Sequence, residues 1–197
     1  MLSIKEPTEE LYVINKSKFY SFAFPVLQEN QAKDILDRLR HEYNDATHVC
    51  FAYVLSSPRM EKASDDGEPS GTAGKPLLEL IKKKKLENVL IVSVRYFGGI
   101  KLGAGGLVRA YTNSGNLVLD KAQVVEVEMI NKYLLTCDIS IGSKVSQTII
   151  SLGGKVLTSR YLDKVNIEYI GEIQDKLLTM YSNNVTIQKI GSETVCQ

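Results

Sequence analysis

The sequence predicts an α+β protein in two domains, on the basis of its length, its mixed hydrophobic periodicity and the order of its elements. The chain has 197 residues, enough for one domain or two small ones, since a domain usually holds about 100–200 residues. Segments with strand-like and helix-like patterns follow one another along its whole length. In the second half their order is β-α-β-β-α-β, the ferredoxin-like arrangement. We therefore expect domains at 1–130 and 131–197.

The first half begins with a predicted β-hairpin, an amphipathic helix and a buried strand. Residues 8–26 carry aromatic and β-branched side chains on both sides of a turn at 15–17, as hairpins do. Residues 29–43 place aliphatic side chains at helical spacing, with charged residues between them. The segment 47–55 is almost wholly apolar, which predicts a strand buried on both faces.

Two unusual loops separate the remaining elements of the first half. Residues 56–74 are a long polar stretch, and loops of this length without structure of their own are usually functional or disordered. A helix over 76–85 and a buried strand over 88–94 are expected next. The glycine-rich segment 95–106 follows, and a helix begins after it. A strand, a glycine-rich loop and a helix in this order aim backbone N–H groups at an anion.

The second half carries the ferredoxin-like pattern without any cluster of unusual residues. Its expected elements are one or two strands after residue 124, a helix over 142–152, strands over 155–161 and 165–170, a helix over 174–181 and a strand over 185–190. The boundary between the domains should lie within extended chain, between residues 125 and 135.

Composition excludes several classes of function. The chain has 24 basic and 23 acidic residues, a net charge of +1, so it does not bind nucleic acid through bulk charge, although a local basic patch remains compatible with these numbers. The three cysteines form no CxxC motif, which excludes a thiolate zinc site and a disulfide framework. Two histidines are too few for a multi-histidine metal site. The charged N-terminus and the short uncharged runs predict a cytoplasmic protein with no membrane partner.

The segment DDGEPSGTAG, residues 65–74, has a structural and a functional interpretation. Structurally it is a turn in which Ser70 or Thr72 caps the following helix. Functionally it is a surface on which Asp66 and Glu68 hold a basic partner or Mg²⁺, while the two hydroxyl groups donate to phosphate. Asp65, Asp66 and Glu68 could ligate Mg²⁺ with oxygen donors, but three neighbouring carboxylates also fit a solvated loop.

The segment RYFGGIKLGAGGLVRAY, residues 95–111, combines cations, aromatic rings and glycines. This mixture suits a nucleic-acid backbone or a nucleotide, since glycines allow close approach and aromatic rings stack on bases. The structural alternative is a tight crossover on the sheet, with Arg109 paired to a carboxylate of the acidic loop. Neither the P-loop nor the GxGxxG pattern is satisfied, because Pro76 and Val108 stand at required positions.

His48 and Cys50 lie on one face of the expected strand over 47–55. His48 has two interpretations: a histidine hydrogen-bonded at a strand end, or part of the cleft that the two loops form. A Cys-His nucleophilic pair is disfavoured, because residues two apart on one strand rarely reach catalytic geometry with a third orienting group.

Three blocks in this order, DATHVCFAY at 45–53, DDGEPSGTAGKP at 65–76 and RYFGGIKLGAGGLVRAY at 95–111, resemble the signature of the IMPACT/YigZ family. The resemblance covers about residues 8–125. It implies a first domain similar to domain 2 of ribosomal protein S5, and a second similar to the ferredoxin-like domains late in elongation factor G. It also implies an association with translation. Eukaryotic relatives restrain a starvation-activated kinase with the help of a further domain, and that role is not carried over.

We therefore expect a non-enzymatic, translation-linked regulatory factor whose first domain binds RNA or a ribosome-associated partner through one cleft. Its cations would contact phosphates and Tyr96 would stack on a base. The residues expected at this site are His48, Asp66, Gly67, Glu68, Ser70, Gly71, Thr72, Arg95, Tyr96, Gly98, Gly99, Lys101, Gly103, Gly105, Gly106 and Arg109.

Two other classes of function compete with this expectation. One is an enzyme acting on a nucleotide or a phosphorylated metabolite, with the glycine loop on the phosphate and Mg²⁺ at Asp66 and Glu68. The other is a protein-interaction module in which the two loops form a docking face. No cofactor other than Mg²⁺ is expected.

Overall fold

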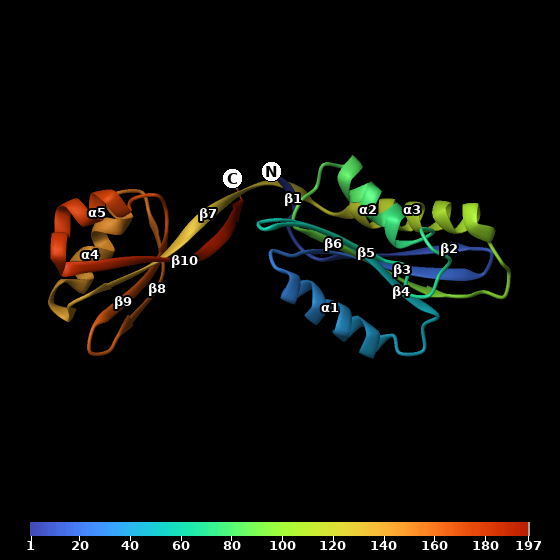
Figure 1. Ribbon diagram of the computed structural model, residues 1–197, viewed down its shortest axis with the longest axis horizontal. Coiled ribbons are helices and arrows are strands. Elements are labelled where there is room, and N and C mark those ends of the chain that lie inside the picture. Colours follow the sequence, from blue (N-terminus) through green and yellow to red (C-terminus); the bar gives the residue numbers. More distant parts are fainter. Residues whose placement is uncertain (197) are drawn as a thin grey trace. The chain divides into compact units, whose positions relative to one another are not determined.

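The computed structural model describes residues 1–196, and the chain divides into two compact units, 1–126 and 127–197 (Figure 1). The division falls inside the long strand β7 (Val124–Cys137) rather than in a flexible linker. The expected boundary was placed four residues later, at 130/131, within the same strand. Among the helices of the described residues, none has both the length and the apolar character needed to cross a bilayer.

The first unit is a five-stranded antiparallel sheet with helices on both faces. The strand order is β2-β3-β6-β4-β5. Helix α1 covers one face, and α2 and α3 cover the other (Figure 1). The elements are β2 (Thr8–Ile14), β3 (Ser17–Pro25), α1 (Glu29–Glu42), β4 (His48–Ser56), β5 (Arg59–Ser64), α2 (Gly74–Lys83), β6 (Val89–Tyr96) and α3 (Gly103–Lys121).

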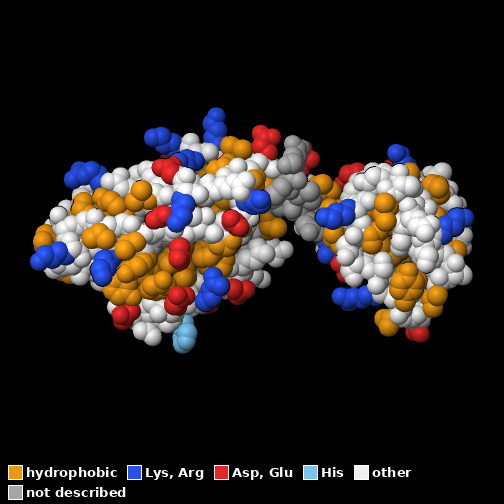
Figure 2. All heavy atoms as spheres, turned by 180° about the vertical axis from the view of Figure 1, so that it is seen from behind, with side chains coloured by type: hydrophobic (Ala, Val, Ile, Leu, Met, Phe, Trp, Pro, Cys, Tyr) orange, Lys and Arg blue, Asp and Glu red, His pale blue; other side chains and the backbone are white. Residues whose placement is uncertain are grey.

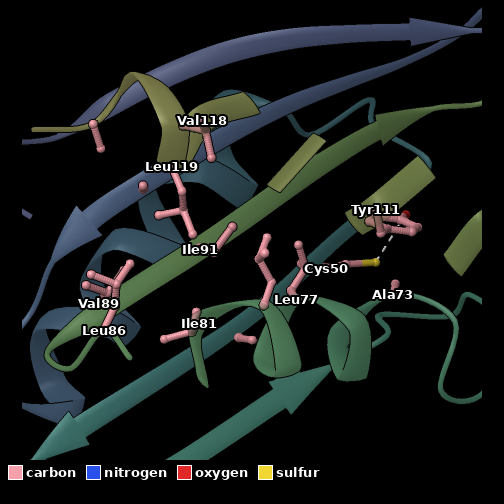
Figure 3. Close-up of a cluster of buried hydrophobic side chains, with 14 of the residues drawn as sticks. Cys50, Ala73, Leu77, Ile81, Leu86, Val89, Ile91, Tyr111, Val118 and Leu119 are labelled. Carbon is pink, nitrogen blue, oxygen red and sulfur yellow. Dashed lines mark hydrogen bonds between the residues drawn. The ribbon is translucent and has the colours of Figure 1, made fainter. Parts of the chain in front are cut away.

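The two central strands, β4 and β6, are buried on both faces, as their apolar sequences predict. Alternate residues of these strands enter two separate cores. Cys50 and Ile91 pack under α2 and α3, against side chains such as Leu77 and Tyr111 (Figure 3). Their sequence neighbours pack under α1.

Three features of the first unit differ from the sequence-based expectation. The polar stretch 56–74 contains β5, which pairs only with β4 at the sheet edge and is largely exposed, so it shows no hydrophobic alternation. The short strand β1 (Leu2–Ile4) pairs with the first residues of β7. Helix α3 begins at Gly103, earlier than expected. Its first turn is rich in glycine, the weakest helix former after proline, so the sequence did not predict that this turn is helical.

The second unit has the predicted order of elements, β-α-β-β-α-β. Its strands form an antiparallel sheet in the order β10-β7-β9-β8. One core of apolar side chains, including Leu135, Val145 and Ile167, joins the sheet to its helices. The elements after β7 are α4 (Ile139–Ser151), β8 (Lys155–Tyr161), β9 (Val165–Ile170), α5 (Gln174–Tyr181), a 3-10 turn (Ser182–Asn184) and β10 (Val185–Cys196).

Candidate nucleic-acid interface

A cavity of about 430 Å³ opens where β4 begins, β6 ends and α3 begins; we call it the central cleft. Five of the predicted site residues line it: His48, Glu68, Arg95, Lys101 and Gly103. The topology explains why they meet. The strands β4 and β6 are antiparallel and His48 lies directly opposite Arg95, so β4 begins where β6 ends, at the same end of the sheet. The remaining lining residues are Thr47, Pro69, Phe97, Leu102, Ala104 and Leu107.

Glu68 is the centre of a buried network at the base of this cleft. Its Oε1 accepts hydrogen bonds from Arg95 Nη1 at 2.6 Å and from the Tyr111 hydroxyl at 2.8 Å. Its Oε2 lies 3.7 Å from His48 Nε2. The side chains of Glu68 and Arg95 are only 3% and 6% exposed, so this is a buried ion pair. Removing either partner would leave the other charge buried without compensation.

Arg95 therefore has a different role from the phosphate contact predicted for it. Besides the bond to Glu68, its Nη2 donates to Ser17 Oγ at 3.4 Å. Its guanidinium carbon lies 5.4 Å from the Phe19 ring centre and 5.5 Å from that of Phe97. The positive charge of Arg95 is used inside the protein, and it was Arg95, not Arg109, that paired with the acidic loop.

The thiol of Cys50 is buried between the acidic loop and α3. Its thiol lies 3.0 Å from the Asp65 carbonyl oxygen and 3.3 Å from the Tyr111 hydroxyl, the contact drawn as a dashed line in Figure 3. Burial raises the pKa of Cys50 to about 12. Because the thiolate is the reactive form, this raised pKa works against a Cys-His pair, which the sequence already disfavoured.

His48 is oriented by the backbone of the acidic loop. Its Nδ1 lies 2.8 Å from the Asp66 carbonyl oxygen. A carbonyl oxygen can only accept a hydrogen bond, so Nδ1 is the donor. The other ring nitrogen, Nε2, faces Glu68. Gly67 packs against this ring: it has a φ of +86°, and a Cβ there would lie 3.4 Å from His48 Nδ1. The acidic loop thus holds the imidazole at the wall of the cleft.

Asp65, which the sequence indicated only as a possible Mg²⁺ ligand, caps helix α2. Its carboxylate accepts three backbone N–H groups, from Gly71 at 2.7 Å, Ala73 at 2.9 Å and Gly74 at 2.8 Å. Burial acts to raise the pKa of Asp65, but these three donors outweigh it and lower the pKa below its ordinary value. Helix capping by Ser70 or Thr72 was therefore a wrong prediction.

The Thr72 hydroxyl and the carboxylates of the loop are engaged within the protein, whereas Ser70 is exposed. Thr72 is buried and donates to the Pro69 carbonyl at 2.6 Å, so it is not free to donate to phosphate. Asp66 Oδ2 accepts the Val49 N–H at 2.6 Å, and its Oδ1 lies 3.7 Å from Arg40 Nη2. Asp66 and Glu68 thus point to different partners, and the part of the chain that the structure describes contains no group of three or more metal-ligating side chains.

The glycines of the second loop divide into two groups. Gly98 lies against the backbone of the β2–β3 turn, where a Cβ would overlap Lys16 and Ser17. Gly103, Gly105 and Gly106 form the first turn of α3, which has no acidic residue and no side-chain cap. The first N–H groups of a helix lack partners within it, so this end of α3 presents donors beside the exposed Lys101.

The other predicted residues lie outside the lining of the central cleft. Tyr96 lines a second cavity, of about 280 Å³, together with Lys16 and Lys18, two cations that the sequence did not single out. Gly71 lines a groove of about 640 Å³ between α2 and α3. The rest, none of which lines the central cleft, are Asp66, Gly67, Ser70, Thr72, Gly98, Gly99, Gly105, Gly106 and Arg109.

Comparison with known proteins assigns the chain to a family. The model of the Impact N-terminal domain matches residues 15–119, which is most of the first unit and includes every residue that lines the central cleft, and the chain belongs to the IMPACT family. It is similar to the IMPACT family member YvyE of Bacillus subtilis, with 36% identity over 93% of this chain and 84% of that protein. The IMPACT family member YigZ of Escherichia coli is 34% identical over 79% of this chain and 78% of its own length.

A solved structure shares the whole architecture. The crystal structure of a hypothetical protein superimposes with a TM-score of 0.73 and 29% identity, over 98% of both chains. The family resemblance of the three sequence blocks is thereby confirmed, and the α+β fold with two antiparallel sheets extends to this neighbour.

Proposed function

We propose that this protein is a non-catalytic, translation-linked regulatory factor of the cytoplasm that binds RNA through the central cleft. One observation carries the proposal: the exposed Lys101 and the uncapped start of a 19-residue helix stand beside Phe97, a residue that is 45% exposed. The helix N-terminus and the lysine both attract a phosphate group. An exposed aromatic ring beside them offers a stacking surface for a base.

Family membership and topology support the wider setting of this proposal. The translation link follows from what the IMPACT family resemblance implies. We further infer that the first domain is of the S5 domain 2 type. The second domain is of the ferredoxin-like type, because its elements follow the β-α-β-β-α-β order and its strands lie in the order β10-β7-β9-β8.

The charge distribution sets the expected character of binding. Figure 2 shows basic and acidic side chains interspersed over the visible face of the first unit, without a broad area of one sign. The net charge of the chain is only +1. Affinity for RNA must therefore come from a few local contacts, and it should be modest and sensitive to salt.

The proposal is tested by replacing Lys101 with serine and measuring the binding of fluorescent hexauridylate by anisotropy over a series of salt concentrations. Removing one phosphate contact should weaken binding and reduce the log–log salt slope by about 0.7 on a single strand. Lys33→Ser is the matched control, since Lys33 is an exposed lysine on α1 that pairs with Glu29 and lines none of these cavities. Equal slopes for the two variants, or no binding by the wild type at low salt, would contradict the proposal.

A further inference from the structure

We infer that the RNA ligand is single-stranded and lies across two adjoining cavities, with a base on Phe97 and a phosphate on either side; this rests on the proposed function. The observation behind it is that Phe97 lines both the central cleft and the second cavity, the one lined also by Lys16 and Lys18. The ring of Phe97 therefore stands at the boundary between two hollows, each of which has its own cations. We call the two cavities together the Phe97 strip.

The backbone around Phe97 is held in place by polar contacts. The Phe97 N–H donates to Thr47 Oγ1 at 3.0 Å, and the next N–H, of Gly98, donates to Ser17 Oγ at 3.2 Å. The absence of a side chain at Gly98 lets this segment lie directly on the backbone of Lys16. Phe97 is thus fixed before any ligand arrives, which lowers the entropic cost of stacking a base on it.

The second cavity has a rigid aromatic wall. Tyr96 donates its hydroxyl proton to Asp45 Oδ1 at 2.6 Å, and this bond raises the pKa of Tyr96 to about 12. The rings of Tyr20 and Tyr96 meet edge to face, with centres 5.9 Å apart. Lys18 lies directly opposite Tyr96 in the paired strands β3 and β6. The register of the sheet therefore places a lysine beside these two rings.

The cations of the strip are available to a ligand. Lys16, Lys18 and Lys101 are exposed, and none of them forms an ion pair with a residue that the structure describes. The one carboxylate that lines the second cavity, Asp45, already accepts the Tyr96 hydroxyl. The strip thus runs from Lys16 and Lys18, over the aromatic ring of Phe97, to Lys101.

This order of charges and rings fits successive nucleotides of an unpaired strand. A phosphate on each side of a stacked base is the repeat of single-stranded RNA, and a duplex keeps its bases stacked on each other, out of reach of a protein ring. An acidic peptide would satisfy the lysines but leave Phe97 without a planar partner. A mononucleotide would occupy one cavity only. Affinity should consequently rise steeply from one nucleotide to several.

The experiment compares uridine monophosphate, a series of oligouridylates up to hexauridylate, an RNA duplex and a hexaglutamate peptide by anisotropy or competition, with the full chain. Phe97→Leu removes the ring but keeps an apolar side chain, and should weaken hexauridylate binding about tenfold. Lys16→Asn/Lys18→Ser should reduce the salt slope by about 1.4, because two contacts to a single strand are lost. Asparagine is chosen at position 16 because the backbone there has a φ of +63°.

A matched control and three outcomes decide the inference. Lys33→Ser/Lys62→Ser also removes two exposed lysines, both paired with Glu29 on another part of the unit, and should leave the slope unchanged. Suppose that hexauridylate binds and that Lys101→Ser weakens this binding, while the Phe97 and Lys16/Lys18 variants bind as the wild type does. The inference that RNA lies along the Phe97 strip is then wrong, and the proposed function stands. If the duplex or hexaglutamate binds with the same affinity as hexauridylate, the inference of a single-stranded ligand along the strip is also wrong. Absence of RNA binding by the wild type overturns both.

Discussion

Replacing Glu68 with glutamine should lower the free energy of unfolding by about 3–5 kcal/mol, the usual effect of breaking a buried ion pair. Glutamine has nearly the same shape and can still accept the Tyr111 hydroxyl, so the change removes chiefly the negative charge that Arg95 Nη1 meets at 2.6 Å. The guanidinium group of an arginine stays positively charged in proteins. The buried charge of Arg95 would therefore remain without a counter-ion.

The loss is measured by urea-induced unfolding of the full chain, followed by circular dichroism. Glu61→Gln is the matched control: Glu61 pairs with Lys82 at 3.2 Å and Arg59 at 3.3 Å, but its side chain is 28% exposed, and surface pairs contribute about 0–1 kcal/mol. A Glu68 variant that is no less stable than the Glu61 variant would show that the buried pair does not stabilise the fold.

Replacing Gly98 with alanine should destabilise the protein by about 1–3 kcal/mol, as overpacking usually does. The added Cβ would overlap the backbone of Lys16 and Ser17, and backbone cannot move aside as a flexible side chain can. The same displacement would shift Phe97 and weaken RNA binding in parallel. Thermal unfolding and the anisotropy titration measure the two effects on one preparation.

Gly105→Ala separates this effect from a general sensitivity of the loop to substitution. A Cβ at Gly105 would contact only Arg109 Nη1, at 3.7 Å, and alanine favours the helix over glycine by up to about 1 kcal/mol. We expect this variant to be as stable as the wild type or more so. If Gly98→Ala were equally stable, the close approach of the two backbones would not be required.

The layered core could be predicted from the sequence because it depends on local pattern. The apolar sequences of β4 and β6 predict that both strands are buried, and the amphipathic pattern of each helix predicts which of its faces is buried. The element order of the second unit follows from the same reasoning. Strand β5 could not be predicted in this way, since its exposed edge position imposes no alternation.

Some residues of the candidate site could be predicted from the sequence. The contacts between segments far apart in the chain could not. The glycine-rich segment with Lys101 was expected to be a loop, and its last glycines instead form the first turn of α3, whereas His48 lines the cleft in which it was expected. Glu68 and Arg95 both looked like surface charges, because nothing local shows that they neutralise each other 27 residues apart. Lys16 and Lys18 were missed for a related reason: the hairpin was evident, but its pairing with β6, which brings them to Tyr96, is a property of the sheet.

The most direct test of the account is to map hexauridylate binding on the isotope-labelled wild-type chain by NMR chemical-shift changes at low salt. The account predicts changes concentrated in the Phe97 strip: the backbone amides of Lys16, Phe97 and Gly98 and those of the first turn of α3, from Gly103 to Gly106. Changes confined to the second unit, or to the groove between α2 and α3 lined by Lys75 and Lys83, would contradict it.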